Sequence, residues 1–336
     1  MGNYCTYDEI KSQTSAWVQA IDLVRTSPLP QAADFDQVIF TGCGSTYYLS
    51  LAAAALYQQL TGRPARAVSG GELWLNAQVS LAPGRTLLVA VSRSGTTTET
   101  AQAVERFRAD KLGSVMVISN YHEALSRLAD VDIVIEQGQE QSVAQTRSFA
   151  SMYVAAVAVC ARMAARTDLL SSMAGLPAVG EHLLTRYESY AQEIGKDLDF
   201  DRFYFLGSGI RYGLACEMNL KMKEMTLTHS EPFHFLEFRH GPMSMVNKTT
   251  LVIGLLSDAQ RLQEMKVLSE MEAIGARVMR LAETDADVTF GSTIPEAVRG
   301  VLYLPVLQLV AFYRALAKGL NPDRPHNLTA VVKLDI

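Results

Sequence analysis

Continuous apolar runs recur along the chain and predict strands that are buried on both faces. RTLLVAVS (residues 85–92) and TTLVIGLLS (residues 249–257) are apolar over most of their length, and each is followed by a helical segment. SVMVISN (residues 114–120) and ARVMRLAE (residues 276–283) are the next runs of this kind. Strands that alternate with helices in this way predict an α/β fold with parallel sheets.

An internal repeat predicts that the chain has two similar halves. DFDQVIFTGCGSTYYL (residues 34–49) aligns without gaps to DFDRFYFLGSGIRYGL (residues 199–214), with eight identities in sixteen positions. Each copy reads as a short strand, a Gly-x-Gly turn and a long helix, which is how an α/β unit begins. We therefore predict two tandem doubly wound, flavodoxin-like subdomains, each with a parallel sheet flanked by helices.

These patterns also predict the boundaries of the parts. Residues 1–32 form an N-terminal helical segment with its helix at 7–25, and residues 33–170 form the first subdomain. A linking helical region at 171–195 leads to the second subdomain at 196–320. The tail at 321–336 contains two prolines, so we expect it to be extended rather than helical.

Composition and charge narrow the class of protein. With 336 residues and 49% apolar content, the chain can bury a large core, and its net charge of −5 argues against nucleic acids and anionic membranes as partners. Its most apolar segments, at 153–165 and 301–313, are too short to span a bilayer and read as buried helices. The N-terminus resembles no secretory signal, so the cytoplasm is the expected location. The four cysteines form no CxxC pair and are expected to be buried free thiols.

Two loops carry candidate binding residues. GCGS (residues 42–45) lacks the third glycine of a dinucleotide fingerprint, because Tyr47 stands there, so no nicotinamide cofactor is expected; a plain strand-to-helix turn is the alternative interpretation. SRSGTTTET (residues 92–100) places five hydroxyls at the start of a helix, which favours a phosphate monoester. N-capping would explain one or two of these hydroxyls. The equivalent loop of the second half, LLSDAQ, has lost the cluster, so phosphate is expected to bind the first half only.

Three of the six histidines, His229, His234 and His240, fall within residues 219–243 and raise three possibilities: a metal site, an acid–base site or ordinary surface. Their spacings of five and six residues match no HExxH or HxH pattern, so no metal is expected. Just before them, Glu217, Lys221 and Glu224 share one helix face, which is also compatible with a solvated ladder of ion pairs.

Taken together, these motifs resemble the sugar isomerase (SIS) family. The resemblance rests on GCGS, SRSGTTTET, VAQTRSF (residues 143–149), EMNLKMKE (residues 217–224) and FRHGP (residues 238–242), in this order on a duplicated α/β chain. It covers nearly the whole chain. The most similar members are the isomerase domain of glucosamine-6-phosphate synthase, glucosamine-6-phosphate deaminases and fructosamine-phosphate deglycases.

The resemblance implies roles for individual residues. The phosphate of a sugar phosphate would be held by Gly44, Ser45, Thr46, Ser92, Arg93 (mainly through its backbone), Ser94 and Thr97, and the sugar would contact Val143 and Gln145. Glu224 would move a proton between C1 and C2, and His240 would assist ring opening, reaching the site from the partner subunit of a homodimer. Lys221, one turn before Glu224, would hold that carboxylate ionised.

One departure from the family changes the expected chemistry. Synthase-type members carry a Schiff-base lysine in the C-terminal tail, where this chain has Ala330, and Lys333 is not an evident substitute. We therefore predict breakdown or isomerisation rather than synthesis: glucosamine-6-phosphate to fructose-6-phosphate plus ammonia, through an enolamine. The alternatives are a fructosamine-6-phosphate deglycase and a non-catalytic regulator that senses sugar phosphates. A regulator would need the phosphate loop but neither Glu224 nor His240.

Overall fold

The computed structural model describes residues 4–332 and 334 and divides the chain into two compact units. The first unit comprises Ser12–Glu140, Gln145–Ala174 and Thr329–Ile336. The second unit comprises Met1–Lys11, Gln141–Ala144 and Gly175–Leu328. The division runs through helix α1 (Cys5–Thr26), the N-terminal helix that the sequence predicts.

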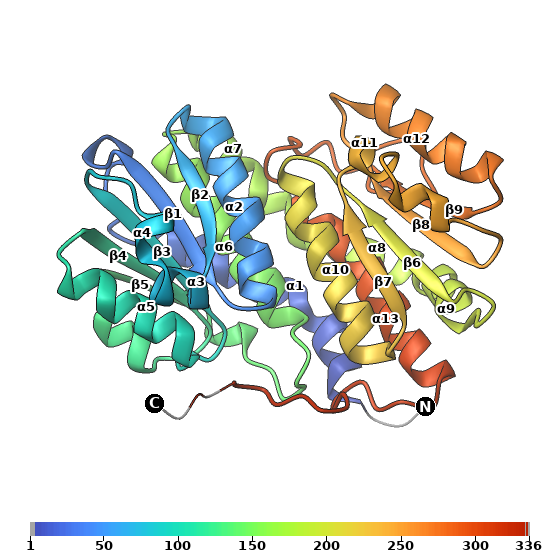
Figure 1. Cartoon of the computed structure of the whole chain (residues 1–336), viewed down its shortest axis with the longest axis horizontal. Coiled ribbons are helices and arrows are strands. Elements are labelled where there is room, and N and C mark those ends of the chain that lie inside the picture. The colour runs from blue at the N-terminus through green and yellow to red at the C-terminus, as the bar shows by residue number, and fades with distance from the viewer. Residues whose placement is uncertain (1–3, 333, 335–336) are drawn as a thin grey trace. The chain divides into compact units, whose positions relative to one another are not determined.

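The first unit is built on a five-stranded parallel sheet in the order β2-β1-β3-β4-β5 (Figure 1). The strands are β1 (Gln37–Gly42), β2 (Ala65–Ser69), β3 (Thr86–Ser92), β4 (Gly113–Ser119) and β5 (Val131–Val134). The helices are α2 (Ser45–Thr61), α3 (Gly70–Leu75), α4 (Ala77–Ser80), α5 (Thr98–Ala109), α6 (Arg147–Met163) and α7 (Thr167–Ser172). Every residue of β1 and β3 is buried, as the apolar run of β3 predicts for a strand covered on both faces.

The second unit repeats this arrangement. Its sheet has the order β10-β9-β8-β6-β7, so both sheets follow the flavodoxin-like order 2-1-3-4-5 when the strands of each are counted along the chain. The strands are β6 (Arg202–Leu206), β7 (His229–Phe233), β8 (Thr250–Leu255), β9 (Arg277–Ala282) and β10 (Val288–Thr289). The helices are α8 (Leu176–Arg186), α9 (Glu188–Lys196), α10 (Ile210–Thr226), α11 (Phe235–Phe238), α12 (Arg261–Ala273) and α13 (Leu304–Ala317). The predicted pair of doubly wound α/β subdomains is confirmed.

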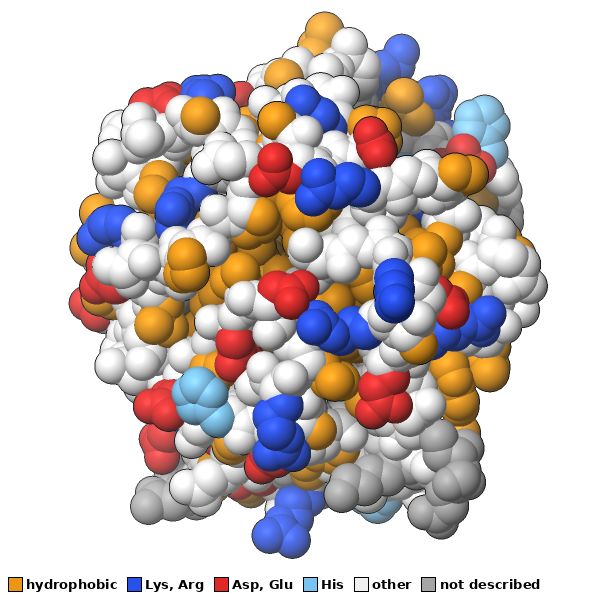
Figure 2. All heavy atoms as spheres, turned by 90° about the vertical axis from the view of Figure 1, so that its left-hand side faces the viewer, with side chains coloured by type: hydrophobic (Ala, Val, Ile, Leu, Met, Phe, Trp, Pro, Cys, Tyr) orange, Lys and Arg blue, Asp and Glu red, His pale blue; other side chains and the backbone are white. Residues whose placement is uncertain are grey.

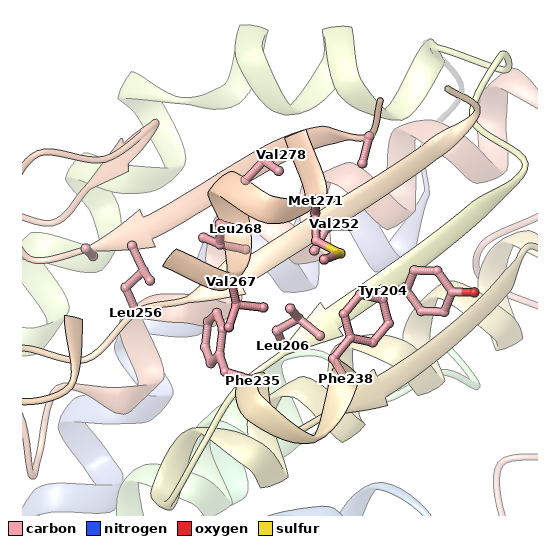
Figure 3. Close-up of a cluster of buried hydrophobic side chains, with 12 residues drawn as sticks. Tyr204, Leu206, Phe235, Phe238, Val252, Leu256, Val267, Leu268, Met271 and Val278 are labelled. Carbon is pink, nitrogen blue, oxygen red and sulfur yellow. The ribbon is translucent and has the colours of Figure 1, made fainter. Parts of the chain in front are cut away.

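A buried cluster fixes the short helix α11 on the second sheet (Figure 3). Tyr204 of β6 packs against Phe238 of α11 with ring centroids 4.8 Å apart, and Phe235 belongs to the same cluster. Val267, Leu268 and Met271 of α12 come from one face of their helix and complete it. Because removing a buried phenylalanine ring typically costs about 3–5 kcal/mol, these contacts hold the FRHGP segment where it leaves α11.

The Gly-x-Gly turns adopt the same backbone conformation in both units. Gly44 has φ 57° and ψ −123°, and Gly209 has φ 58° and ψ −129°, a region that essentially only glycine occupies. A Cβ on the preceding glycine would lie 2.5 Å from a helix atom in each case, Thr46 Oγ1 for Gly42 and the Arg211 carbonyl oxygen for Gly207. The local backbone structure therefore explains why both positions of each turn are occupied by glycine.

The segment between α10 and the FRHGP motif contains a strand that the sequence did not predict. His229–Phe233 form β7, an edge strand that pairs with β6 from Arg202↔His229 to Leu206↔Phe233. Pro232 obscured this strand in the sequence, but a proline is tolerated at a sheet edge, where one side of the strand needs no ladder hydrogen bonds.

The apolar segments near 153–165 and 301–313 are core helices, as predicted. The expectation that the second segment is too short to cross a membrane is wrong: among the described residues, the stretch Gly300–Ala317 is long and apolar enough. However, 89% of this stretch is buried inside the protein. The tail from Asn321 to Val332 contains no helix or strand. The four cysteines are free, but only Cys160 and Cys216 are buried, whereas Cys5 and Cys43 are partly exposed.

Candidate active site

Two loops of the first unit meet at the switch point of its sheet. β1 and β3 are neighbours, paired up to Thr41↔Ala90, and the chain leaves them in opposite directions across the sheet, which is where doubly wound folds bind ligands. The GCGS loop follows β1 and the Ser-rich loop, defined as residues 92–98, follows β3. Cys43 Sγ lies 3.4 Å from Thr100 Oγ1 and so joins the two segments. Burial raises the pKa of the Cys43 thiol, so it stays protonated and is a poor nucleophile.

The hydroxyls of the Ser-rich loop lie close to one another. Gly95 donates its N–H to Ser92 Oγ at 3.2 Å, and Ser92 Oγ lies 3.4 Å from Thr97 Oγ1. Ser94 Oγ accepts both the N–H and the hydroxyl of Thr96, each at 3.2 Å. Four hydroxyls are thus gathered at the N-terminus of α5, where first-turn N–H groups and the helix dipole favour an anion.

N-capping does not account for this cluster. Thr97 is the N-cap residue of α5, with φ −60° and ψ 122°, and its side chain makes no capping hydrogen bond. Thr46 is different, since its hydroxyl accepts the Cys43 N–H at 2.9 Å and donates to the Cys43 carbonyl at 3.0 Å. Thr46 therefore stabilises the GCGS turn, while the Ser-rich loop is the better candidate for an anion.

The side chain of Arg93 contacts Glu140 and Ala330, both in the first unit. It is 7% exposed, its Nη1 lies 3.7 Å from Glu140 Oε2, and its Nη2 donates to the carbonyl oxygen of Ala330. The Glu140 side chain is fully buried and accepts the N–H of Thr146 at 2.8 Å and of Ser148 at 3.0 Å. Glu140 thereby satisfies N–H groups at the start of α6.

A cavity of about 240 Å³ lies beside these groups. Its walls come from the Ser-rich loop, the segment after β4 and the C-terminal tail: Arg93, Ser94, Thr96, Tyr121, Glu123, Glu140, Ala330 and Val331. Ligand sites typically enclose about 300–1,000 Å³, so this cavity is large enough for part of a sugar phosphate only.

The VAQT segment is divided between the two units. Val143 belongs to the second unit, where its N–H donates to the Asp323 carbonyl at 3.0 Å. Gln145 belongs to the first unit, where its Oε1 accepts the Ser148 hydroxyl at 3.5 Å. Ser45, the other residue expected in this site, is 3% exposed at the first position of α2.

In the second unit, the corresponding loop is filled by a carboxylate of the protein itself. Glu264, on α12 and 2% exposed, accepts the N–H of Ser257 at 2.6 Å and its hydroxyl at 3.0 Å. Ser257 Oγ accepts the N–H of Gln260 at 2.9 Å, as Ser92 Oγ does from Gly95.

One arginine lies beside this internal carboxylate. Arg211 lies 3.8 Å from Glu264 and 2.5 Å from Glu296, which also accepts the Asp258 N–H at 3.2 Å. Burial raises the pKa of Glu264, and the Ser257 hydrogen bonds and Arg211 act in the opposite direction. In the second unit, the N–H and the hydroxyl of Ser257 are thus already bonded to Glu264. The described contacts of the equivalent Ser92 in the first unit include no such internal carboxylate.

The acidic and basic residues of α10 form a buried ion triad. Lys221 Nζ lies 2.5 Å from Glu224 Oε2 and 3.4 Å from Glu217 Oε1. The side chains of Lys221 and Glu217 are 1% and 2% exposed, so the alternative of a solvated ladder is wrong. Glu224 is the accessible member, with 20% of its side chain exposed. The triad therefore presents one carboxylate to solvent and backs it with a shielded cation.

The three histidines have different surroundings. His240 is exposed just after α11, and within the described part of the chain its ring makes no ion pair. His234 stacks on Tyr212 with centroids 3.9 Å apart, and desolvation lowers its pKa. His229 is exposed on β7, with its Nε2 3.9 Å from Glu231 Oε1. No group of three or more potential metal ligands occurs among the described residues.

Acidic and basic side chains are interspersed on the face shown in Figure 2, with no single-sign field over it. That surface gives no electrostatic footprint for a polyanion such as nucleic acid.

A comparison of the sequence with known protein families agrees with the division into two similar α/β halves. The SIS domain matches residues 33–162 and 199–288, which together cover the sheets and loops described above. The chain belongs to the SIS domain family. The two matched segments begin with the duplicated strand–Gly-x-Gly–helix sequence of each half.

Curated relatives of this SIS protein are glutamine–fructose-6-phosphate aminotransferases (isomerizing). That of Sulfolobus acidocaldarius is 31% identical over 260 residues, which is 74% of this chain and 42% of the relative. That of Pyrococcus horikoshii is 27% identical over 316 residues, which is 90% of this chain and 52% of the relative. The chain thus spans about half the length of these relatives.

Solved structures similar to this SIS protein share its fold along the whole chain. Glucosamine-6-phosphate deaminase from Thermotoga maritima is 24% identical, covers 98% of this chain and 99% of its own, and has a TM-score of 0.82. Tagatose-6-phosphate ketose/aldose isomerase from Escherichia coli is 24% identical, covers 96% and 95%, and has a TM-score of 0.83. These neighbours and the curated relatives carry the names of enzymes that act on sugar phosphates, which supports an enzyme.

Some residues of the site escaped sequence reasoning. Glu140 lies six residues before Thr146, which is not the spacing of a capping box, and only the folded loop brings its carboxylate to α6. No sequence motif distinguishes Glu264 from the other polar residues of α12. The Arg93 side chain contacts Ala330, which lies 237 residues later in the chain. Lys333 lies outside the described residues.

Proposed function

We propose that this SIS protein is a phosphosugar isomerase that deaminates an amino-sugar phosphate, converting glucosamine-6-phosphate and water to fructose-6-phosphate and ammonia. The observation that carries the proposal is the hydroxyl cluster at the N-terminus of α5, on the switch point of the first sheet. Neutral hydroxyl and N–H donors without a lysine suit a phosphate monoester better than a nucleoside triphosphate with magnesium.

The phosphate would be bound by Ser92, Ser94 and Thr97, together with backbone N–H groups at Arg93 and in the GCGS loop. Binding the phosphate fixes the far end of the substrate and leaves C1 and C2 to the acid–base residues, which gives the orientation that proton transfer requires. The proposal requires both sets of residues to act on the same molecule.

Glu224 is the proposed proton carrier. After His240 assists opening of the ring, the Glu224 carboxylate removes the proton from C2, which leaves an enolamine, and returns it to C1. The resulting C2 imine is hydrolysed by water to the ketone and ammonia. Lys221 supports this role because its ammonium, 2.5 Å from Glu224 Oε2, fixes the position of the carboxylate.

The test is an assay of the purified protein with glucosamine-6-phosphate, measuring ammonia and fructose-6-phosphate in parallel. Glu224→Gln is expected to lower kcat by about 10²–10⁴-fold, the usual contribution of general acid–base catalysis. Glu181→Gln, which changes an exposed glutamate of the same unit, serves as the control and should leave kcat unchanged. Undiminished turnover by Glu224→Gln would remove that residue from its role.

Two other functions make different predictions in the same assay. A fructosamine-6-phosphate deglycase would release an amino acid from a sugar-phosphate conjugate and leave glucosamine-6-phosphate intact. A sugar-phosphate-sensing regulator would bind without turnover. Ala330, where synthase-type relatives carry lysine, is the reason that breakdown is proposed rather than synthesis.

The proposal extends to assembly and location. The protein would act as a homodimer whose subunits complete each other's site, with His240 reaching the partner's substrate, and it would work in the cytoplasm without a metal or other cofactor. The exposure of His240 supports the first point, since a histidine that acts in trans must be presented on the surface.

A further inference from the structure

Arg93 belongs to the Ser-rich loop, but its side chain forms a hydrogen bond with the C-terminal tail. The guanidinium donates to the carbonyl oxygen of Ala330, 237 residues later, and is only 7% exposed. The phosphate role expected for Arg93 involves its backbone, so this contact leaves the side chain with a separate task.

A second contact holds the same tail to the same segment. The N–H of Leu334 donates to Thr98 Oγ1 at 3.1 Å, at the first residue of α5. Thr329 Oγ1 donates to the Val331 carbonyl at 3.0 Å, which bends the tail locally. The tail thus contacts the Ser-rich loop near both ends of that loop, at Arg93 and at Thr98. The described part of the tail forms no helix or strand.

Glu140 fixes the guanidinium in this position. Its carboxylate is fully buried, 3.7 Å from Arg93 Nη1, and its orientation is set by the Thr146 and Ser148 donors of α6. A planar guanidinium can face a carboxylate and a carbonyl at the same time, which a lysine ammonium does less well. Arg93 therefore links three segments of the first unit: the Ser-rich loop, the start of α6 and the tail.

We propose that Arg93 is a positioning residue that anchors the tail segment Thr329–Val332 to the Ser-rich loop, so that Ala330 and Val331 form one wall of the pocket that receives the sugar phosphate. The anchoring stands on the contacts above, and the statement about the sugar phosphate rests on the proposed function. Ser94 and Thr96 line the same cavity.

Anchoring and phosphate binding can be separated. The hydroxyls and backbone N–H groups of the loop hold the phosphate whether or not the tail is in place, whereas the wall beside the sugar is lost when the tail detaches. Arg93→Gln should therefore weaken binding of a sugar phosphate, such as glucosamine-6-phosphate, by about tenfold. Binding of inorganic phosphate should change little.

Hydrogen exchange at the Leu334 amide tests the anchoring without any ligand. In Arg93→Gln that amide is expected to exchange about tenfold faster than in the wild type, with Arg93→Lys intermediate. Arg108→Gln, which removes an exposed arginine of α5 paired to Asp130 at 3.1 Å, is the matched control and should leave the rate unchanged. Equal exchange in wild type and Arg93→Gln would overturn the anchoring.

A double-mutant cycle with a chain ending at Leu328 separates anchoring from damage to the fold. If Arg93 acts through the tail, the shortened chain binds glucosamine-6-phosphate as weakly as Arg93→Gln, and combining the two changes adds nothing. An equal loss from Arg93→Gln with and without the tail would contradict the proposal, because it would mean that the arginine acts through Glu140 alone. If the wild type binds inorganic phosphate but no sugar phosphate, the proposed function fails with the pocket wall, and the exchange rates alone decide the anchoring.

Discussion

Lys221 and Glu224 are joined by a 2.5 Å ion pair in which the ammonium is 1% exposed and the carboxylate 20% exposed. The same ammonium lies 3.4 Å from Glu217, whose side chain is also buried. A cation in this position cannot be solvated by bulk water, so it depends on the two carboxylates, and they depend on it. The proposed base is thus held at the edge of a charge cluster that the protein interior keeps in place.

Removing that cation should affect both stability and activity. In Lys221→Met, Glu217 is left buried without its counter-charge, and the free energy of unfolding is expected to fall by about 3–5 kcal/mol. Turnover should fall with it, because Glu224 loses the ion pair that fixes the position of its carboxylate. Lys223→Met is the matched control: the same substitution two residues away, at an exposed position, should change the free energy of unfolding by less than about 0.5 kcal/mol in chemical denaturation.

The two halves should respond differently to loss of a serine. Ser94→Ala removes a hydroxyl of the phosphate cluster and should weaken binding of a phosphate ligand by about tenfold or more, since hydrogen bonds to charged groups are worth about 1.5–3 kcal/mol. Ser257→Ala should leave that affinity unchanged, because Glu264 already takes its donors. Calorimetric titration with glucosamine-6-phosphate distinguishes the two, and equal losses would defeat the assignment of phosphate to one unit.

Burial of Glu264 predicts a pH effect on stability. Because its pKa is raised in the folded protein, the folded state binds this proton more tightly, and its contribution to stability is lost as pH rises above the ordinary value of 4.5. In Glu264→Gln this contribution disappears, so the wild type should lose stability relative to the variant as pH increases above 4.5. Denaturation curves of the wild type and Glu264→Gln at several pH values measure the difference, and parallel curves for the two proteins would contradict it.

The Gly-x-Gly turns should tolerate no side chain at their second glycine. Gly44→Ala and Gly209→Ala force a Cβ into a backbone region that L-residues avoid, and each should cost about 1–3 kcal/mol although nothing lies within 4 Å to clash. Gly71→Ala in α3 also meets nothing within 4 Å but has no positive φ, and it should be neutral or slightly stabilising. A similar cost at all three positions would contradict the conformational explanation.

A shared site can be detected by mixing two inactive variants. If His240 acts on the partner's substrate, a mixture of Glu224→Gln and His240→Gln should recover about a quarter of wild-type activity, because half of the random dimers carry one complete site of two. The mixture must first be allowed to exchange subunits, and light scattering checks that dimers are present. Recovery of no activity from exchanged dimers would show that each subunit uses its own histidine.

The repeating elements of the fold were predictable from the sequence, because buried parallel strands and Gly-x-Gly turns leave strong local patterns. The unbroken apolar runs at β3 and β8 and the duplicated segments at β1 and β6 were enough to predict both sheets. β2, β5, β7 and β10 were not predicted. Pro232 disguises β7, and the two residues of β10 are too few to carry a pattern. The hydroxyl loop and the Lys221–Glu224 pair were visible as motifs. The partners of Glu140, Arg93 and Glu264 were not, since each depends on loop closure or on long-range folding.

The carboxylate of Glu264 gives the two similar units different thermodynamic dependence on ligand. In the second unit, the carboxylate that occupies the loop belongs to Glu264 and is part of the chain itself. The loop is therefore ordered whether or not a sugar phosphate is present. In the first unit the anion is exchangeable, and a bound phosphate adds RT ln(1 + [L]/Kd) to the stability of that unit. Protection from hydrogen exchange should accordingly rise with the concentration of inorganic phosphate in the segments of the first sheet, while the protection of the second sheet should not change.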